Sequence, residues 1–300
     1  MAEPRRWVLT GASGWFGRTA LWEYEQLHGP EALRRDVVAC ASRAKQIDFG
    51  SPYGPVSAVA LEAIDSLDDA SGLIHLAFLT RDRVTEFGVQ DYINHNRAIT
   101  DRIENFIRAN PGIPILTTSS GAAAVFDLGH VNLAGDPYAA LKQEEEELWR
   151  NSGRNRLAIV FRVYAAIGRF IKDPTVFALS DFLHRALAGK HIEIRSKRSV
   201  IRSYVHVGSM MRLFWAMLEN PIGPGFRIVD AAMQTLSLLE LAQLITVLWR
   251  LPEPEHRIEP SVPADVYQAD TRVFLSLLEQ YQIKTPSFVD QLKEATFGML

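Results

Sequence analysis

The chain of 300 residues contains one cysteine, Cys40, so it cannot form an internal disulfide. A chain without disulfides suits a reducing compartment, and we expect a cytoplasmic protein. Long hydrophobic runs are also missing, since none approaches the roughly 20 residues of a membrane span. The N-terminus has no apolar signal-like segment either. The sequence therefore predicts no membrane partner.

Strong charge of one sign is absent as well. The chain has 32 Lys and Arg against 35 Asp and Glu, a formal net charge of -3. A weakly acidic chain without a basic block is a poor binder of nucleic acid. The eight histidines show no metal-ligand spacing, and one cysteine provides no zinc set, so we expect no metal.

Short apolar segments alternate with longer helical patterns in the first half of the chain. The segments show little period-2 alternation, as expected of strands buried on both faces. They are Arg6–Thr10, Asp36–Ala41, Val56–Leu61, Gly72–Phe78, Ile113–Ser119 and Leu157–Val163. Helices are predicted over Trp15–His28, Gln90–Ala109 and Pro137–Asn151. This order predicts an α/β protein with a parallel sheet and right-handed crossovers.

A glycine-rich turn joins the first strand to the first helix. Gly11 permits a tight turn, Gly14 lets the backbone approach a pyrophosphate, and Gly17 allows close packing of helix on strand. The helix N-terminus then holds the anion. We expect dinucleotide contacts from the whole turn: Gly11, Ser13, Gly14, Trp15, Phe16 and Gly17. A tight turn without a ligand is the alternative.

The end of the second strand bears on the choice of dinucleotide. An acidic residue there would bind the ribose 2′-hydroxyl, but the chain reads Ala41-Ser42-Arg43. Arg43 beside Ser42 suits a 2′-phosphate, which favours NADP over NAD as cofactor without excluding NAD. The alternative for Arg43 is a solvated residue after a strand.

Tyr138 and Lys142 stand four residues apart on a predicted helix, so both lie on one face. A phenol with a pKa of about 10 is a weak acid or base at neutral pH, and a nearby ammonium favours the phenolate. The strand that ends at Ser119-Ser120-Gly121 offers hydroxyls at the carboxyl edge of the sheet. A serine there can polarise a substrate carbonyl. We expect Ser120, Tyr138 and Lys142 to be the catalytic groups.

These motifs together resemble the extended short-chain dehydrogenase/reductase family of NAD(P)-dependent sugar-nucleotide epimerases, dehydratases and reductases. Thr10–Gly17 resembles TGxxGxxG, and His75-Leu76-Ala77 resembles the HLA that ends the fourth strand. Tyr92, Asn96 and Thr100 match a helix pattern, Tyr138 and Lys142 match YxxxK, and Arg202–Val207 matches a segment whose Arg meets a nucleotide phosphate. The resemblance implies a Rossmann-type doubly wound sheet and a homodimer through the Gln90–Ala109 and Pro137–Asn151 helices. It also implies that Ala77, Asn96 and Lys142 contact the cofactor, while Phe78, Ser120, Gly121 and Arg202 contact substrate.

The second half of the chain is expected to form a smaller mixed region. We expect a dinucleotide-binding domain over 1–163 and a substrate region over 164–300, with segments near 200–230 returning to the sheet. Ile192–Arg195 and Val200–Val207 are predicted to form a strand pair. Met211, Trp215 and Leu218 are expected in the core.

Two polar segments have less certain roles. Four acids in a row, Glu144–Glu147, cannot share one helix face, so most are expected in solvent. The segment Leu79–Arg83 can face either substrate or solvent. Gly121-Ala122 lacks the Asp-Glu pair that dehydratases of the family carry, so dehydration is not expected.

The sequence thus favours an NAD(P)-dependent carbonyl reductase acting on a nucleotide-sugar-like small molecule. A nucleotide-sugar epimerase with retained cofactor and a non-catalytic NADP-sensing protein remain alternatives.

Overall fold

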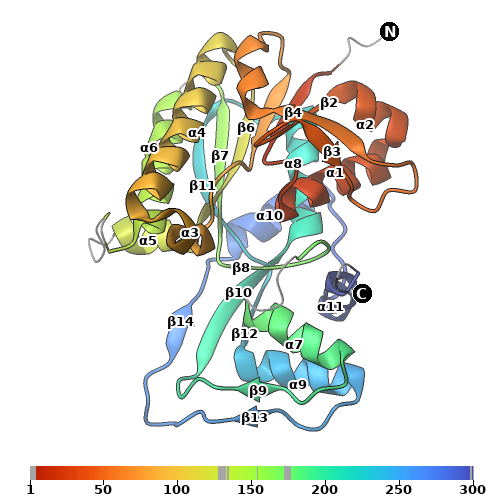
Figure 1. The fold of residues 1–300 in the computed structure, drawn as a ribbon, viewed down its shortest axis with the longest axis vertical. Helices are drawn as coiled ribbons and strands as arrows, with labels where there is room; N and C mark the ends of the chain where they lie inside the picture. The colour runs from red at the N-terminus through yellow and green to blue at the C-terminus, as the bar shows by residue number, and fades with distance from the viewer. Residues whose placement is uncertain are drawn as a thin grey trace. The chain divides into compact units, whose positions relative to one another are not determined.

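The computed structural model describes residues 5–127, 133, 135–153, 155–171, 177–297 and 299. The chain divides into two compact units. The first comprises Met1–Arg162 and Met211–Val229, and the second comprises Val163–Met210 and Asp230–Leu300. Figure 1 shows both units and labels helices and strands in each.

The first unit is built on an eight-stranded sheet in the order β11-β7-β6-β5-β1-β2-β4-β3. The strands are β1 (Trp7–Thr10), β2 (Val37–Ala41), β3 (Lys45–Ile47), β4 (Val56–Ala60), β5 (Gly72–His75), β6 (Ile115–Ser120), β7 (Leu157–Val163) and β11 (Gly225–Ala231). β1 is parallel to β2 and β5, β2 to β4, and β5 to β6, while β3 runs antiparallel to β4. The expected α/β class with a Rossmann-type sheet is confirmed. The chain leaves β1 toward β2 and later returns to its other side with β5, which makes this the switch point where such sheets bind ligands.

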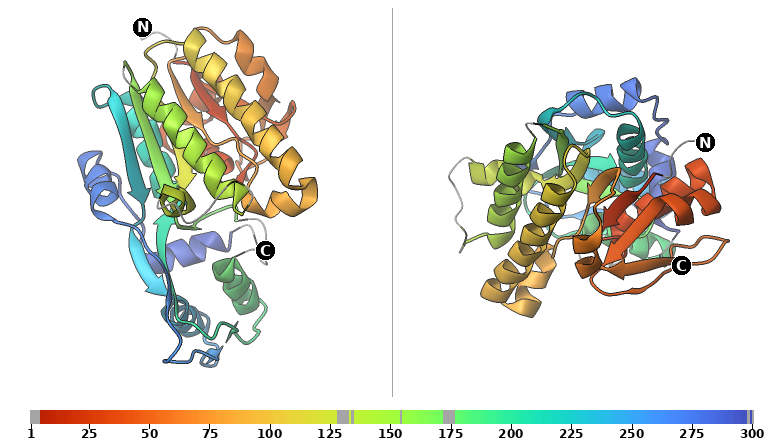
Figure 2. Two further views of the ribbon diagram at one scale, coloured as in Figure 1. Left: turned by 90° about the vertical axis from the view of Figure 1, so that its left-hand side faces the viewer. Right: turned by 90° about the horizontal axis from the view of Figure 1, so that it is seen from above.

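Helices cover both faces of this sheet because its strands are apolar on both sides. α4 (Val89–Ala109) and α6 (Pro137–Ser152) lie side by side (Figure 2). Their Ile103, Phe106 and Trp149 pack in one cluster with Val8 and Ile115 of the strands.

On the other face lie α1 (Trp15–His28) and α8 (Val207–Glu219). The ring of Phe161 lies 4.7 Å from that of Phe214 on α8, and Trp215 Nε1 donates to Ala20 O on α1 at 2.9 Å. Trp215, Met211 and Leu218 are buried, as expected.

Short helices connect these elements: α2 (Pro30–Asp36), η1 (Leu61–Ser66), η2 (Arg81–Arg83), α3 (Val84–Phe87) and α5 (Gly121–Asp127). β5 ends at His75, three residues before the predicted end of that strand. The reason is local, because the Thr10 hydroxyl accepts the N–H groups of Leu76 and Ala77 at 3.2 and 3.3 Å, which turns the chain away from the sheet.

The second unit contains a small sheet around β10 (Val200–His206), with β12 (Gln234–Ser237), β14 (Asp265–Tyr267) and β8 (Ala165–Ile167). Its helices are α7 (Ala178–Leu187), α9 (Leu238–Trp249), α10 (Arg272–Gln280) and α11 (Phe288–Ala295). The predicted pairing of the segments near 192–195 and 200–207 is wrong. β9 (Glu193–Ile194) pairs instead with β13 (Glu255–His256), because β10 is already bonded to β12, β14 and β8. Among the described helices, none combines the length and the apolar character that crossing a bilayer requires.

Candidate active site

The glycine turn after β1 has the geometry that close backbone approach demands. Gly11 has a φ of 68°, and a Cβ on it would lie 2.5 Å from the carbonyl carbon of Leu76. A Cβ on Gly17 would lie 2.5 Å from Ala12 Cα, so a larger residue would push α1 off the strand. Gly14 is the N-cap of α1 and is exposed. The first turn of α1 therefore faces solvent at the carboxyl edge of the sheet. Because its N-cap Gly14 has no side chain, an anion can approach the backbone N–H groups of this turn.

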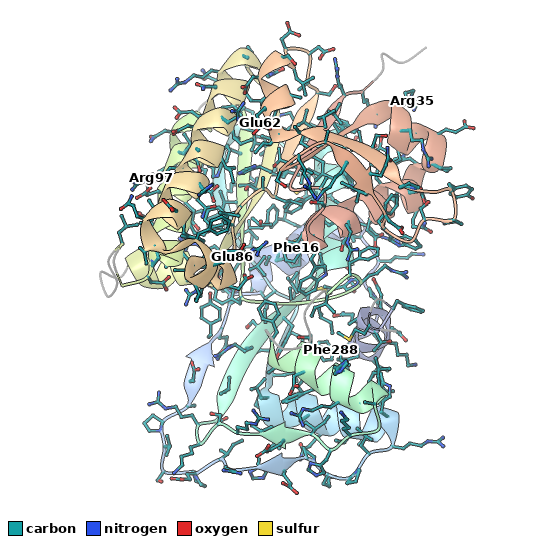
Figure 3. The ribbon with its side chains drawn as sticks, viewed as in Figure 1. Phe16, Arg35, Glu62, Glu86, Arg97 and Phe288 are labelled. Carbon is teal, nitrogen blue, oxygen red and sulfur yellow. The ribbon has the colours of Figure 1, made fainter. Side chains whose placement is uncertain are left out.

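The other predicted residues of the turn lie on its rim. Ser13 is half-buried, and the rings of Trp15 and Phe16 meet edge to face at 5.5 Å on the first turn of α1. Figure 3 labels Phe16. At the end of the neighbouring β2, Ser42 and Arg43 are both exposed, and no carboxylate follows the strand within Ser42–Gln46.

The segment after β5 is attached to α4. Tyr92 donates its hydroxyl to Leu79 O at 2.7 Å, and Asn96 Oδ1 accepts the Leu79 N–H at 2.8 Å. Asn96 is fully buried, and its amide nitrogen donates to Tyr92 O at 3.2 Å. In this structure Asn96 therefore orders the chain that carries Ala77 and Phe78, the residues expected to line the site.

α6 carries Tyr138 in its first turn. Asp136 caps this helix, accepting the Ala139 N–H at 3.1 Å, and Pro137 occupies the first helical position. Ser120, at the end of β6, hydrogen-bonds with Tyr138. The neighbouring Ser119 hydroxyl is buried without a hydrogen-bond partner among the described atoms. The structure thus places Ser120, rather than Ser119, beside the phenol.

Lys142 lies one turn further along α6 and is buried. Its Nζ donates to Glu145 Oε2 at 2.8 Å and to Thr118 O at 3.2 Å. The ring centroid of Phe78 lies 3.6 Å from Nζ, and the Phe78 ring also meets the Tyr138 ring edge-on at 5.9 Å. Phe78 therefore contacts both predicted catalytic side chains.

Glu145 is part of a buried polar chain. His75 Nε2 lies 3.4 Å from Glu145 Oε1, and His75 Nδ1 lies 2.8 Å from Thr10 Oγ1. Burial raises the pKa of Glu145, but Lys142 and His75 outweigh it, so that pKa lies below its ordinary value. Glu145 is thus a carboxylate that neutralises the lysine inside the protein.

The pKa of Tyr138 reflects both its burial and the groups around its hydroxyl. Burial raises the pKa of Tyr138, while the hydrogen bond with Ser120 and the charge of Arg81 lower it, and the net direction is upward. Burial is the largest of these causes, because a buried phenolate loses its solvation. The role of Lys142 toward the phenol stays a prediction.

The acidic run on α6 also differs from its prediction. Glu144 and Glu147 are exposed, but Glu145 and Glu146 are buried, and Glu146 forms an ion pair with Arg162 at 2.5 Å. Sequence reasoning missed Glu145 as part of the site. The available signal was helical spacing, since positions 138, 142, 145 and 149 follow one face of a helix.

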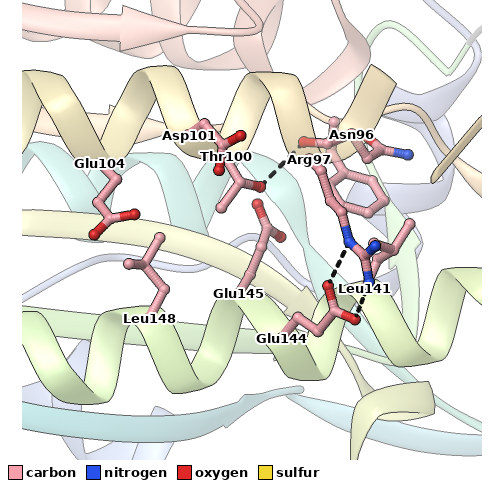
Figure 4. A pocket seen from close by; sticks show the side chains of 10 residues that line it. Asn96, Arg97, Thr100, Asp101, Glu104, Leu141, Glu144, Glu145 and Leu148 are labelled. Atoms are coloured by element: carbon pink, nitrogen blue, oxygen red, sulfur yellow. Dashed lines mark hydrogen bonds and ion pairs between the residues drawn. The ribbon is translucent and has the colours of Figure 1, made fainter. Parts of the chain in front are cut away.

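A cavity of about 240 Å³ lies between α4 and α6 (Figure 4). Arg97 and Glu144 form a 2.7 Å ion pair at its mouth, where both are nearly half exposed. Ser120 and Tyr138 are not among the residues that line this cavity. The lining residues come from both helices and from Phe78: Phe78, Asn96, Arg97, Thr100, Asp101, Glu104, Leu141, Glu144, Glu145 and Leu148.

The remaining predicted site residues fall in different places. Gly121 is buried where β6 passes into α5. Arg202 lies on β10 of the second unit, where its guanidinium forms a 2.8 Å ion pair with Asp265. In the described residues, no three His, Cys, Asp or Glu side chains gather as metal ligands.

The sequence is similar to a known protein family and, over part of its length, to a sugar-nucleotide reductase. A sequence profile of the NAD dependent epimerase/dehydratase family matches residues 7–229. A dTDP-4-dehydro-6-deoxy-D-allose reductase from a Streptomyces species is 34% identical over 85 residues, which are 28% of this chain and 25% of that protein. The matched part is thus only about a quarter of that relative's length.

Solved structures share the fold along almost the whole chain. MoeE5 in complex with UDP-glucuronic acid and NAD has a TM-score of 0.70 at 18% identity, covering 96% of this chain and 97% of that one. A UDP-N-acetylglucosamine 4-epimerase from Methanobrevibacter ruminantium M1, in complex with UDP-N-acetylmuramic acid, has a TM-score of 0.70 at 16% identity and 97% coverage of each chain. At these identities the likeness establishes a common fold.

Proposed function

Because the chain belongs to the NAD dependent epimerase/dehydratase family and is an NAD(P)-dependent enzyme of the short-chain dehydrogenase/reductase type, we propose that it reduces a carbonyl group on a nucleotide-sugar-like substrate. The Streptomyces relative is named as a reductase of a dTDP-linked dehydro-sugar, which supports this substrate class.

One arrangement supports the choice of reduction, namely the Tyr138 phenol beside Ser120 at the end of β6. A phenol, whose ordinary pKa is about 10, carries a proton at neutral pH and can donate it, and burial raises the pKa of Tyr138 further. A carbonyl that accepts hydride must also accept a proton on its oxygen. The hydrogen bond between Ser120 and Tyr138 brings a second hydroxyl to the same point, where it polarises the carbonyl oxygen.

The proposed cofactor is NADPH, which supplies the hydride when bound. The turn at Gly11, Gly14 and Gly17 fits a pyrophosphate, because backbone replaces side chains where the anion would lie. Arg43 is proposed to hold the 2′-phosphate. Lys142 has three N–H donors, of which Thr118 O and Glu145 accept two, and the third is proposed for the nicotinamide ribose.

Cofactor balance tests the proposal. The purified chain is incubated with NADPH or NADH and a set of nucleotide sugars and their keto forms, and products are followed by mass spectrometry. We expect one NADPH oxidised for each carbonyl reduced. A changed sugar stereocentre with no net NADPH oxidation would instead identify an epimerase.

The Tyr138→Phe variant separates catalysis from sensing. Loss of the proton donor should reduce the rate by about 10²- to 10⁴-fold while cofactor binding remains. Wild-type protein that binds NADPH tightly but turns over none of the substrates would favour the sensing alternative.

A homodimer through α4 and α6 is part of the proposal. Light scattering of the purified chain tests it, with twice the 33.7 kDa chain mass as the expected result.

A further inference from the structure

Arg81 lies over the ring of Tyr138, although the sequence pattern pairs that tyrosine with Lys142. The Arg81 guanidinium carbon is 5.1 Å from the centre of the Tyr138 ring, and Nη2 is 2.6 Å from Asp136 Oδ2. Arg81 follows β5 in the short helix η2, within the polar segment whose orientation the sequence left open. Tyr138 therefore has the Arg81 guanidinium over its ring, and none of the sequence motifs predicts this contact.

The positions of Arg81 and of the helix that carries Tyr138 are both fixed by hydrogen bonds. One oxygen of Asp136 caps α6 through the Ala139 N–H, and the other accepts from Arg81. The chain that leads to Arg81 is bonded to α4 at Leu79, through Tyr92 and Asn96. The same carboxylate that starts the helix bearing Tyr138 thus sets the guanidinium above that helix's first turn.

Lys142 is paired with the buried Glu145, and an ion pair seen from a neighbouring group acts as a dipole rather than as a net charge. Asp136 partly neutralises Arg81 in the same way, but the Arg81 guanidinium lies directly over the Tyr138 ring. Its charge lowers the pKa of Tyr138.

We propose that Arg81 is a positioning residue of the Ser120–Tyr138 site, held by Asp136 so that its positive charge stabilises the Tyr138 phenolate left after proton donation. This inference rests on the proposed function for its role in turnover. Hydride adds to the carbonyl carbon, the Tyr138 O–H bond breaks, and its proton goes to the substrate oxygen. The phenolate then takes a proton from solvent.

Within the described residues, charged and titratable groups reach the phenol from several elements. Arg81 comes from η2, Asp136 from the cap of α6, and Glu145 with Lys142 from α6 itself. Tyr92 on α4 also interacts with Tyr138. The charge of Arg81 lowers the pKa of Tyr138.

A titration without substrate tests the charge effect directly. 3-Fluorotyrosine replaces the tyrosines, because ring fluorine lowers the pKa of a phenol and reports its titration in the ¹⁹F spectrum. The Tyr138→Phe variant then identifies the Tyr138 signal in the ¹⁹F spectrum. We expect Arg81→Gln to raise the pKa of Tyr138 by about half a unit or more, and Arg81→Lys to restore most of the difference.

Arg83→Gln is the matched control, because Arg83 lies on the same short helix and pairs with Glu86. It should leave the Tyr138 signal unchanged. Arg81 is 58% exposed, so its variants should fold, and Arg81→Met provides a second neutral variant with a similar stem. An unchanged Tyr138 pKa in both Arg81→Gln and Arg81→Met would overturn the inference.

Turnover distinguishes this inference from the proposed function. For a functional reductase, we expect the alkaline limb of the kcat profile to move upward in Arg81→Gln and not in Arg83→Gln. A shifted ¹⁹F titration in a protein that reduces no carbonyl would reject the reductase proposal and leave the charge relationship standing. A functional reductase with an unshifted titration would reject the role of Arg81 alone.

Discussion

The Lys142 ammonium lies 2.8 Å from the Glu145 carboxylate, with the two side chains only 7% and 4% exposed. A lysine in this position of the family pattern was expected to act on Tyr138. In the structure, the Lys142 ammonium is instead paired with the buried carboxylate of Glu145, one turn along the same helix. The pair therefore links the site to the interior of the first unit, through His75 and Thr10, and has consequences for stability as well as chemistry.

Removal of the buried carboxylate should be costly. Glu145→Gln leaves Lys142 buried without its counter-ion, and breaking a buried pair in this way costs about 3–5 kcal/mol. Glu144→Gln is the matched control, because its partner Arg97 and Glu144 itself are both nearly half exposed and such pairs contribute about 0–1 kcal/mol. Urea unfolding of both variants measures the difference. Equal stabilities would show that Glu145 does not stabilise the folded state.

The same pair predicts a dependence of stability on pH. The pKa of Glu145 is lowered in the folded state, so its contribution is present above the unfolded pKa of about 4.3 and is lost as pH falls through the folded pKa. Stability of the wild type should therefore fall below about pH 5 more steeply than that of Glu145→Gln. Urea midpoints recorded at several acidic pH values check this slope. Parallel curves for the two proteins would contradict it.

Gly11 should be intolerant of a side chain. Its φ of 68° and the 2.5 Å approach of Leu76 mean that Gly11→Ala meets both backbone strain and overlap. We expect a loss of about 3 kcal/mol or more. Gly29→Ala is the control, because Gly29 has a φ of 85° but nothing within 4 Å of a Cβ, so only backbone strain of about 1–3 kcal/mol applies. Thermal unfolding ranks the two, and a Gly29→Ala protein less stable than Gly11→Ala would refute the steric argument.

Arg43 should decide between the two dinucleotides. If its exposed guanidinium holds a 2′-phosphate, Arg43→Ala should weaken NADPH binding by about tenfold or more and leave NADH nearly unchanged. Arg83→Ala removes an equal charge elsewhere and controls for the overall field. Fluorescence titration with both dinucleotides measures the ratio. A wild type that binds NADH and NADPH equally would remove the basis for choosing NADP.

The glycine turn and the order of strands and helices could be predicted from the sequence, because both depend on residues that are close together along the chain. The glycine turn follows from backbone sterics at Gly11 and Gly17, and the order of strands and helices follows from apolar periodicity. The ends of helices and strands were harder to predict from the sequence. β5, for example, ends early because the Thr10 hydroxyl of β1 accepts hydrogen bonds from the residues that follow it. The partner of β9 was not accessible either, because an apolar pattern marks a strand without naming its neighbour.

Spacing along the chain by itself placed Tyr138, Lys142 and Glu145 on one side of one helix, and it placed Ser120 at the end of a strand. Only the tertiary structure decided what charge each of them meets. Burial against β5 turned Glu145 from a solvated acid into the partner of Lys142, and the chain after β5 brought Arg81 over the Tyr138 ring. The physical reason is that electrostatic interactions depend on distance and solvent exposure, and neither quantity is contained in the separation of residues along a sequence.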